Sequence, residues 1–267
     1  MAALYCVMGD PIEHSRSPEI HRRFAAQFSI ALEYRRINVQ PGSLPSMVRR
    51  FAEDGGLGCN ITVPLKEEAA ALSDSLGDGA RQAGAANTLS FGDNGRIHGD
   101  NTDGPGLLRH LRVNLGLELE NASILIIGAG GAARGIIPAL MGANIAKITL
   151  VNRTRKRALE LARRFAPLGA IRAGNPEAET PPPADLVINA SSAGLAGHPP
   201  RLPRSLAAGA HCIDLAYGKA AEAFMSWARR GGARSTHDGW GMLVEQAAES
   251  FAIWHDRHPD TRKLLNP

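Results

Sequence analysis

The feature that most constrains the fold is a glycine-rich stretch that directly follows an apolar run. Residues 123–135 read SILIIGAGGAARG, and the chain keeps a helical pattern to about Leu140. A continuous apolar run is typical of a strand that is covered on both faces. Glycines after such a strand allow a tight turn and the close approach of a phosphate to the N-terminus of the next helix. The stretch therefore predicts a dinucleotide-binding unit, with a glycine-rich turn that binds no ligand as the alternative.

Short apolar runs alternate with helix-like segments along the rest of the chain. Downstream, strands are expected at 147–151, 185–188 and 211–215, and a helix at 154–165. Upstream, strands are expected at 4–8, 32–39 and 58–61, helices after Ser17-Pro18 and at 44–52, 64–72 and 79–84, and a hairpin at 87–91 and 96–98. This alternation predicts an α/β fold with mainly parallel sheets, the second of them doubly wound.

The alternation restarts before the glycine-rich stretch, which predicts two domains. A length of 267 residues allows either one large domain or two smaller ones. We expect an N-terminal α/β domain of residues 1–103 that is completed by residues 239–267, and a Rossmann-like nucleotide-binding domain of residues 104–238. A ligand-binding cleft is expected between the two.

The last long helix, expected at 239–255, has an amphipathic pattern. Its apolar stripe consists of Leu243, Ala247, Phe251 and Trp254. The face opposite carries Glu245, Glu249 and Asp256, so a charged outer face is expected. Gln246 lies at the edge of the apolar stripe, where it is either an ordinary boundary residue or a polar group that points into a cleft.

The composition excludes several classes of protein. Apolar residues make up 44% and charged residues 21%, which rules out disorder for the chain as a whole. A net charge of +4 is small for a nucleic-acid-binding protein. Three cysteines, Cys6, Cys59 and Cys212, without a CxxC pair argue against a disulfide framework and a metal site, and Cys6 and Cys59 are expected to fill buried positions in strands. The chain shows no signal-peptide pattern and no membrane-spanning run, so a cytoplasmic protein without membrane or nucleic-acid partners is expected.

The segment after the second strand of the nucleotide unit distinguishes between two cofactors. A site for NAD usually has Asp or Glu there, which binds the ribose 2′-hydroxyl. Residues 151–157 instead read VNRTRKR, with no acidic residue. Arg153 and Arg157 suit contact with a 2′-phosphate, which favours NADP(H), although Arg155 and Lys156 can equally belong to a solvated helix start.

Four polar clusters fall where strands of the first domain are expected to end. They are residues 14–18 (HSRSP), 60–66 (NITVPLK), 86–88 (ANT) and 99–104 (GDNTDG). Each alone can be explained by caps and turns, with Ser17 as a helix N-cap for example. Ligands of open α/β sheets bind at the carboxyl ends of strands, so the clusters together predict a hydrophilic pocket for a polyhydroxylated acid.

These segments resemble the shikimate dehydrogenase family, which also contains quinate dehydrogenases. The matching stretches are HSRSP (14–18), NITVPLK (60–66), AANT around Asn87 and Thr88, GDNTDG (99–104), GAGGAAR (128–134), NRT (152–154), NASSAG (189–194), DLAY (214–217) and GMLVEQA (241–247). They follow the family order over nearly the whole chain. The resemblance implies the NADPH-dependent, reversible reduction of 3-dehydroshikimate to shikimate in aromatic amino-acid biosynthesis.

The resemblance also implies a role for individual residues. Lys66 and Asp103 match the catalytic pair. Substrate-binding positions are matched by Ser15, Ser17, Thr62, Lys66, Asn87, Asp103, Tyr217 and Gln246, with the two serines at the substrate carboxylate. Cofactor-binding positions are matched by Asp78, Gly128, Ala129, Gly130, Gly131, Ala132, Asn152, Arg153, Thr154, Arg157, Leu215, Gly239 and Met242.

The chemistry of ketone reduction agrees with the catalytic pair. The reaction needs a hydride at carbon, which NADPH supplies, and a proton at oxygen. A lysine beside an aspartate can transfer that proton and stabilise developing negative charge on the oxygen. We expect Lys66 to be the general acid and base and Asp103 to orient it, whereas the bland alternative for Lys66 is a surface lysine on a helix.

The sequence departs from the family pattern at a few positions and leaves alternatives open. Ile61 stands where valine is usual, Ser191 where threonine is frequent, and the chain after Tyr217 reads GKAAEAF without the common proline and threonine. A related enzyme acting on quinate or using NAD, and a catalytically silent NADP-binding homologue, are the competing interpretations. The oligomeric state stays open between monomer and homodimer.

Overall fold

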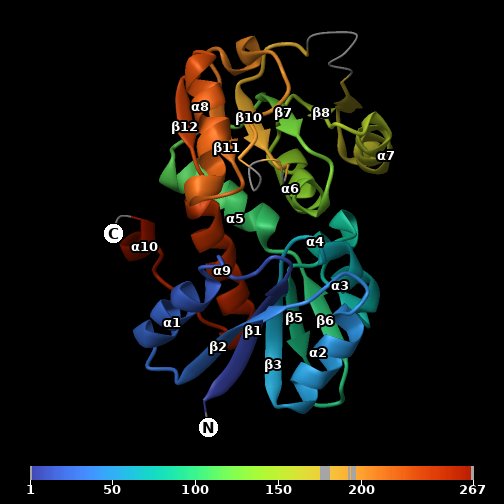
Figure 1. Cartoon of the computed structure of the whole chain (residues 1–267), viewed down its shortest axis with the longest axis vertical. Helices are drawn as coiled ribbons and strands as arrows, with labels where there is room; N and C mark the ends of the chain where they lie inside the picture. Colours follow the sequence, from blue (N-terminus) through green and yellow to red (C-terminus); the bar gives the residue numbers. More distant parts are fainter. Residues whose placement is uncertain (1, 175–180, 192, 194–196, 266–267) are drawn as a thin grey trace. The chain divides into compact units, whose positions relative to one another are not determined.

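The computed structural model describes residues 2–174, 181–191, 193 and 197–265, so the 189–194 stretch lies partly outside the described residues. The chain divides into two compact units (Figure 1). The first contains the residues up to Arg109 together with those from Leu243 onward, and the second contains His110–Met242. Each unit has one six-stranded sheet with helices packed on it, which confirms the predicted α/β class.

The sheet of the first unit is mixed. Its strands are β1 (Ala3–Gly9), β2 (Leu32–Asn38), β3 (Gly56–Ile61), β4 (Ser75–Leu76), β5 (Thr88–Phe91) and β6 (Ile97–Asp100). The spatial order is β2-β1-β3-β5-β6-β4, and three of the five strand pairs are parallel. The antiparallel pair of β5 and β6 confirms the predicted hairpin.

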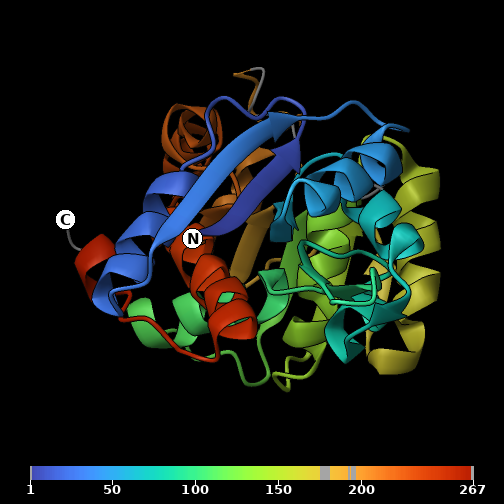
Figure 2. The same cartoon turned by 90° about the horizontal axis from the view of Figure 1, so that it is seen from below.

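Seven helices accompany this sheet in the part of the chain that the structure describes. They are α1 (Ser17–Gln27), α2 (Leu44–Glu53), α3 (Lys66–Leu72), α4 (Asp78–Ala83), α5 (Asp103–Arg109), α9 (Trp240–His255, from Leu243 on) and α10 (Arg262–Leu265). Figures 1 and 2 show α1 beside β2, and α1 also contacts β1. The N-cap of α1 is Arg16, so the prediction of Ser17 as N-cap is wrong by one position: Ser17 lies in the first turn and is buried.

Both faces of β1 are buried, because its side chains alternate between two clusters. Cys6 and Met8 pack on the side of α2, whereas Tyr5 and Val7 pack against Tyr34 on the other side. Cys6 lies opposite Cys59 of β3 in the strand register, and both thiols are free and buried. This confirms the prediction that these two cysteines fill the interior of strands.

The expectation of a charged outer face on α9 is wrong for Glu245, whereas Glu249 is half-buried and Asp256 is exposed. Glu245 is fully buried, and its carboxylate accepts hydrogen bonds from Arg109 Nε at 2.9 Å and Thr261 Oγ1 at 3.0 Å. Val244 and Ala248 on the same face are buried as well. The helical pattern cannot show this, because the partners of Glu245 come from α5 and from the segment before α10.

The sheet of the second unit is entirely parallel. Its strands are β7 (Ser123–Ile127), β8 (Lys147–Val151), β9 (Ile171–Ala173), β10 (Leu186–Asn189), β11 (His211–Asp214) and β12 (Ser235–His237), in the order β12-β11-β10-β7-β8-β9. Helices α6 (Gly131–Met141), α7 (Arg155–Phe165) and α8 (Glu222–Arg230) connect or follow them. The order runs outward from β7 in both directions, as in the predicted doubly wound fold.

Two further properties bear on function. Among the described residues, no helix is long and apolar enough to cross a membrane. In the same part of the chain, no three His, Cys, Asp or Glu side chains are grouped so that they could hold a metal ion.

Candidate active site

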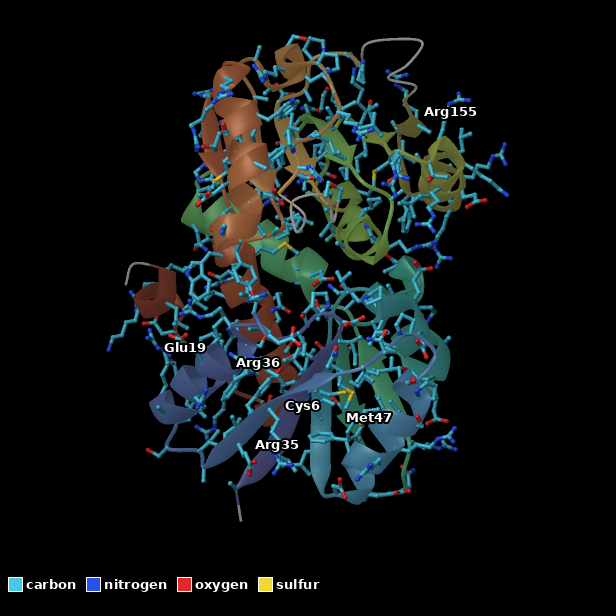
Figure 3. All side chains as sticks on the ribbon, in the orientation of Figure 1. Cys6, Glu19, Arg35, Arg36, Met47 and Arg155 are labelled. Carbon is cyan, nitrogen blue, oxygen red and sulfur yellow. The ribbon has the colours of Figure 1, made fainter. Side chains whose placement is uncertain are left out.

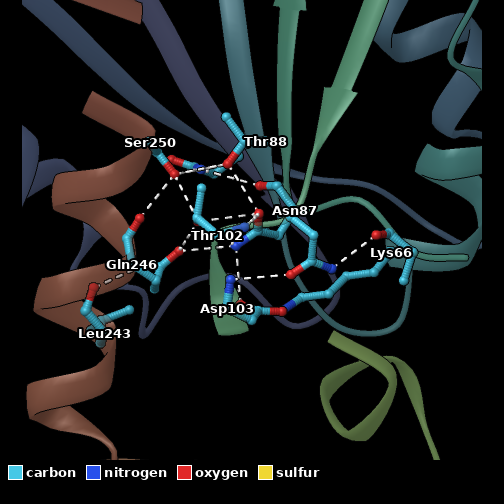
Figure 4. A network of polar contacts seen from close by, with 11 residues as sticks. Lys66, Asn87, Thr88, Thr102, Asp103, Leu243, Gln246 and Ser250 are labelled. Atoms are coloured by element: carbon cyan, nitrogen blue, oxygen red, sulfur yellow. Dashed lines mark hydrogen bonds and ion pairs between the residues drawn. The ribbon is translucent and has the colours of Figure 1, made fainter. Parts of the chain in front are cut away.

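Three of the four polar clusters of the first unit, at 60–66, 86–88 and 99–104, meet at a buried ion pair. Lys66 is the first residue of α3, and Asp103 is the first residue of α5, which begins shortly after β6 ends at Asp100. Lys66 Nζ lies 2.6 Å from Asp103 Oδ2, and the two side chains are only 11% and 5% exposed (Figure 4). An ion pair with so little solvent exposure keeps a fixed geometry and a strong mutual field.

Asn87 holds the other oxygen of the Asp103 carboxylate. Its Nδ2 atom lies 3.0 Å from Asp103 Oδ1, 2.9 Å from Thr102 Oγ1 and 3.1 Å from Gln246 Oε1. An amide nitrogen carries two protons, so it cannot make three full hydrogen bonds at once. The contact with Gln246, which comes from α9, is the longest of the three. Gln246 thus contacts Asn87 and Thr102, and its interpretation as a polar group that points into a cleft stays a prediction.

A second layer of polar side chains lies behind Asn87. Asn60 Nδ2 lies 3.0 Å from Ser250 Oγ and 3.1 Å from Thr88 Oγ1, and Thr88 Oγ1 donates to Asn87 Oδ1 at 3.0 Å. All four residues are buried. The sequence interpretation missed Ser250, whose signal is its position one helical turn after Gln246 on α9.

The two serines of the 14–18 cluster form a pair of their own. Ser15 Oγ lies 3.2 Å from Ser17 Oγ and accepts a 3.3 Å hydrogen bond from the Ser17 N–H. Arg36 of β2, which Figure 3 labels, donates from Nε to the Ser15 carbonyl at 2.8 Å and so fixes this turn. Thr62 follows β3, and its N–H donates to the Met8 carbonyl at the end of β1.

The glycine-rich loop of the second unit fits a diphosphate. Gly128 has φ +118°, and a Cβ atom there would lie 2.8 Å from the Ala190 carbonyl group, so only glycine is accommodated. A Cβ at Gly130 would meet no atom within 4 Å, which leaves open space above the loop. Ala129 links these two glycines, and α6 starts with Gly131 and Ala132, whose N–H groups lie in its first turn. Open space at a helix N-terminus is what an anionic group requires.

The basic segment begins at the end of the neighbouring strand. β8 pairs with β7, and the Gly128 N–H donates to the Val151 carbonyl at 2.8 Å, so the loop and the segment lie side by side. Asn152 Nδ2 bonds the Thr154 carbonyl at 3.0 Å and thereby shapes the turn into α7. Arg153, Thr154 and Arg157 are exposed. No acidic residue occurs from 151 to 157, which suits a phosphate.

The remaining predicted site residues are divided between the two units. Gly239 follows β12, its N–H bonds the Ala216 carbonyl at 2.8 Å, and a Cβ atom there would overlap the Leu215 carbonyl. The Tyr217 ring packs edge-on against Trp240 in the same unit, and Met242 is buried. Asp78 belongs to the first unit, where its side chain is 84% exposed and paired with Arg81.

Comparisons with known proteins agree across the whole chain. A family model described as "Shikimate dehydrogenase substrate binding domain" matches residues 7–89, one described as "Shikimate / quinate 5-dehydrogenase" matches 111–195, and one described as "Shikimate 5'-dehydrogenase C-terminal domain" matches 239–265. The chain is 48% identical over 266 residues to a protein named shikimate dehydrogenase (NADP(+)) from Alkalilimnicola ehrlichii, and the alignment covers 99% of this chain and 98% of that relative.

Solved structures give the same result. A crystal structure of an Ael1 enzyme from Pseudomonas putida has a TM-score of 0.90 at 41% identity and covers 99% of this chain and 97% of its own. The shikimate 5-dehydrogenase of Thermus thermophilus, solved in complex with NADP(H) and shikimate, has a TM-score of 0.85 at 31% identity, with 98% and 97% covered. Relatives of this identity over nearly the full length show that the chain belongs to the shikimate dehydrogenase family.

Proposed function

We propose that this protein catalyses the NADPH-dependent, reversible reduction of 3-dehydroshikimate to shikimate. The observation that carries the proposal is the buried Lys66–Asp103 ion pair braced by Asn87, in a chain whose relative of 48% identity is named shikimate dehydrogenase (NADP(+)). A catalytically silent homologue would have no need to keep a buried lysine in this geometry, because an ion pair removed from water is costly to maintain.

The ion pair transfers the proton to and from the substrate oxygen. Bound NADPH supplies the hydride, and Lys66 Nζ donates the proton to the substrate oxygen. Asp103 orients the ammonium group through its 2.6 Å contact, and Asn87 fixes the carboxylate from the other side. In the reverse direction, the same pair removes the proton from the substrate hydroxyl. Low exposure excludes bulk water, which strengthens each of these interactions.

The substrate is held by hydroxyl and amide side chains. Ser15 and Ser17, next to the N-terminus of α1, bind the carboxylate. Thr62, Asn87, Gln246 and Tyr217 bind the ring hydroxyls together with the ion pair. The contact of Asn87 with Gln246, the longest of its three, is the one that a substrate hydroxyl would replace.

The second unit holds NADP(H). Gly128, Ala129, Gly130, Gly131 and Ala132 receive the diphosphate. The adenosine 2′-phosphate is bound by Asn152, Arg153, Thr154 and Arg157. No acidic residue occurs from 151 to 157, so no carboxylate of this segment repels the phosphate. Leu215, Gly239 and Met242 line the nicotinamide end, and Asp78 of the first unit is a further cofactor-contacting residue.

The two compact units have different roles. The first is the substrate-binding and catalytic domain and the second the NADP-binding domain, with boundaries a few residues from the 103 and 239 expected from the sequence. The free, buried thiols of Cys6, Cys59 and Cys212 suit a reducing compartment, so we infer that the enzyme works in the cytoplasm, as a monomer or homodimer and without nucleic acid.

Initial-rate measurements test the proposal. Shikimate and quinate are each assayed with NADP⁺ and with NAD⁺, and shikimate with NADP⁺ is expected to give the highest kcat/KM. Lys66→Ala is expected to abolish turnover while shikimate binding, followed by calorimetry, changes much less. A wild-type protein that is inactive in all four combinations, or a Lys66→Ala variant with near-normal turnover, would contradict the proposal.

A further inference from the structure

The second unit contains a fully buried carboxylate that the proposed chemistry does not use. Asp214, the last residue of β11, has no exposed surface. Burial raises its pKa to about 7, and the nearby charge of Asp238 acts in the same direction, while hydrogen bonds from Ala216 and Asn189 oppose the shift. Burying a carboxylate costs free energy of desolvation, so the hydrogen bonds that Asp214 makes indicate its role in the fold.

Asp214 is one end of a short chain of hydrogen bonds. Its Oδ1 atom accepts from the Ala216 N–H at 2.9 Å, and its Oδ2 atom accepts from Asn189 Nδ2 at 2.9 Å. Asn189 is the last residue of β10 and is also buried. Its own Oδ1 atom accepts from Ser191 twice, from the backbone N–H at 3.2 Å and from Oγ at 2.7 Å. The chain therefore fixes two turns, at 189–191 and at 214–216.

Both turns border loops that receive the cofactor. The turn at 189–191 lies directly against the glycine-rich loop, because the Ala190 N–H donates to the Ile127 carbonyl and a Cβ atom at Gly128 would lie 2.8–2.9 Å from Ala190 and Ser191. The turn at 214–216 contains Leu215 and precedes Tyr217. The Asn189–Asp214 side-chain bond and the backbone bond from the Leu215 N–H to the Asn189 carbonyl thus connect the turn beside the loop after β7 with the turn after β11.

We propose that Asn189 and Asp214 are positioning residues, which set the spacing between the diphosphate-binding loop and the nicotinamide-binding loop and thereby the affinity for the whole dinucleotide. This inference rests on the proposed function, since it assumes that NADP(H) binds along these loops. Backbone pairing aligns β10 with β7 and β11 up to Asn189 and Asp214, and two backbone bonds continue it, from the Ala190 N–H to the Ile127 carbonyl and from the Leu215 N–H to the Asn189 carbonyl. The side-chain bonds add a second connection between the two turns and fix the conformation of each, because they reach Ser191 and Ala216.

Swapping the two residue types between positions 189 and 214 tests whether their hydrogen bonds matter. In Asp214→Asn, an amide NH₂ replaces one carboxylate oxygen, so either Asn189 Nδ2 or the Ala216 N–H faces a donor and loses its acceptor. In the double variant Asn189→Asp/Asp214→Asn, the carboxylate at 189 accepts from Ser191 and from the new amide, whose oxygen accepts from Ala216. Every hydrogen bond is then made again, with the central one reversed.

Fluorescence titration of the full-length protein with NADPH and with adenosine 2′,5′-bisphosphate separates positioning from general damage. The bisphosphate has a 2′-phosphate for the basic segment and a 5′-phosphate for the glycine-rich loop, but no nicotinamide half that would reach the loop after β11. Its Kd should therefore stay within about twofold in Asp214→Asn, while the Kd for NADPH rises about tenfold or more. The double exchange should return the NADPH Kd to within about threefold of wild type. Asp185→Asn is the matched control, because Asp185 also accepts a backbone N–H but precedes β10 at its other end.

The outcomes are distinct. An unchanged NADPH Kd in Asp214→Asn, an equal loss of both ligands, or no recovery in the double exchange would overturn the inference. If Asp214→Asn does not fold, Ser191→Ala and the double exchange replace it: Ser191→Ala should weaken NADPH but not the bisphosphate, and an unaltered NADPH Kd there would count against the idea. A wild-type protein that binds no NADPH would instead refute the proposed function.

Discussion

Asn60 Nδ2 lies 3.0 Å from Ser250 Oγ, which joins a strand residue near the N-terminus to the last long helix. Ser250 Oγ also lies 2.8 Å from Thr88 Oγ1 and 3.2 Å from Thr102 Oγ1. These hydroxyls surround Asn87, so the side chain that braces Asp103 is itself braced by groups that touch no reacting atom. The position of the ion pair therefore depends on residues such as Ser250, which act on it only through Asn87.

Removing the Ser250 hydroxyl tests this bracing. We expect Ser250→Ala to lower the free energy of unfolding by about 1–3 kcal/mol, because buried donors and acceptors around Asn60 lose a partner. Turnover should fall several-fold with little change in the KM for NADPH, as Asn87 loses its fixed orientation. Ser46→Ala, on the exposed side of α2, is the control and should alter neither quantity. Urea unfolding and initial rates measure both, and an unchanged kcat in Ser250→Ala would argue against bracing.

A substitution of the lysine separates proton transfer from charge. Lys66→Arg keeps a cation beside Asp103, so the fold should persist, but the guanidinium does not release its proton at working pH. We expect kcat to fall by ~10²-fold or more, with a much smaller change in shikimate affinity. Lys147→Arg, on the exposed start of β8, serves as control. Retention of most of the activity in Lys66→Arg would show that only the positive charge matters.

The basic segment should decide between cofactors. Arg153→Ser is expected to raise the KM for NADPH by about tenfold, since a charge-assisted hydrogen bond to phosphate is lost, and to leave the KM for NADH nearly unchanged. Arg155→Ser removes the same charge from the next exposed arginine (Figure 3) and should have little effect. Equal effects of the two substitutions would mean that the segment acts only through its overall charge.

A methyl group at Gly128 should be far more harmful than at another glycine with positive φ. Gly128→Ala combines a left-handed backbone with overlap against Ala190, so we expect NADPH binding to be lost and stability to fall by more than about 2 kcal/mol. Gly116 has φ +63° and no atom within 4 Å of a built Cβ, so Gly116→Ala should cost only about 1 kcal/mol. Denaturant unfolding and NADPH fluorescence compare them, and similar losses would contradict the steric argument.

His21 should make the fold sensitive to acid. It is fully buried against Tyr34, and burial, with repulsion from His255, lowers its pKa from 6.5 to about 3 despite an opposing contact with Asn60. Between these values the unfolded chain binds a proton that the folded chain does not, so stability falls as pH drops from about 6.5 towards 3, by up to about 5 kcal/mol. His21→Phe should lose less stability than wild type over this range in urea titrations. Parallel pH profiles would show that His21 does not titrate in this way.

The sequence predicts well those features that depend on local patterns of apolar, turn and polar residues. The strand at 147–151 and the hairpin around residues 92–95 follow from apolar runs and turn residues. The polar clusters at expected strand ends predicted that Lys66, Asn87 and Asp103 lie together, and their side chains are in contact. The two-residue β4 is too short to leave a pattern. Glu245 was expected outside because a helical pattern contains no information on Arg109 and Thr261, which bury and pair it.

The same limit applies to the buried carboxylate of β11. Nothing in the letters DLAY distinguishes an aspartate that faces solvent from one that accepts hydrogen bonds inside the protein. Its partner Asn189 lies 25 positions earlier, on a neighbouring strand. Only the register of parallel strands brings the two together, and register is a property of the assembled sheet.

The contact between Asn87 and Gln246 spans 159 positions of the chain. During translation at about 5–20 residues per second, the ribosome needs on the order of ten to thirty seconds to reach Gln246 after it has added Asn87. During that period the nascent chain already contains helices α3 and α5, which carry Lys66 and Asp103, but α9 is not yet available to contact the amide of Asn87. The hydrogen bond between Asn87 and Gln246 can thus form only after α9 has left the exit tunnel.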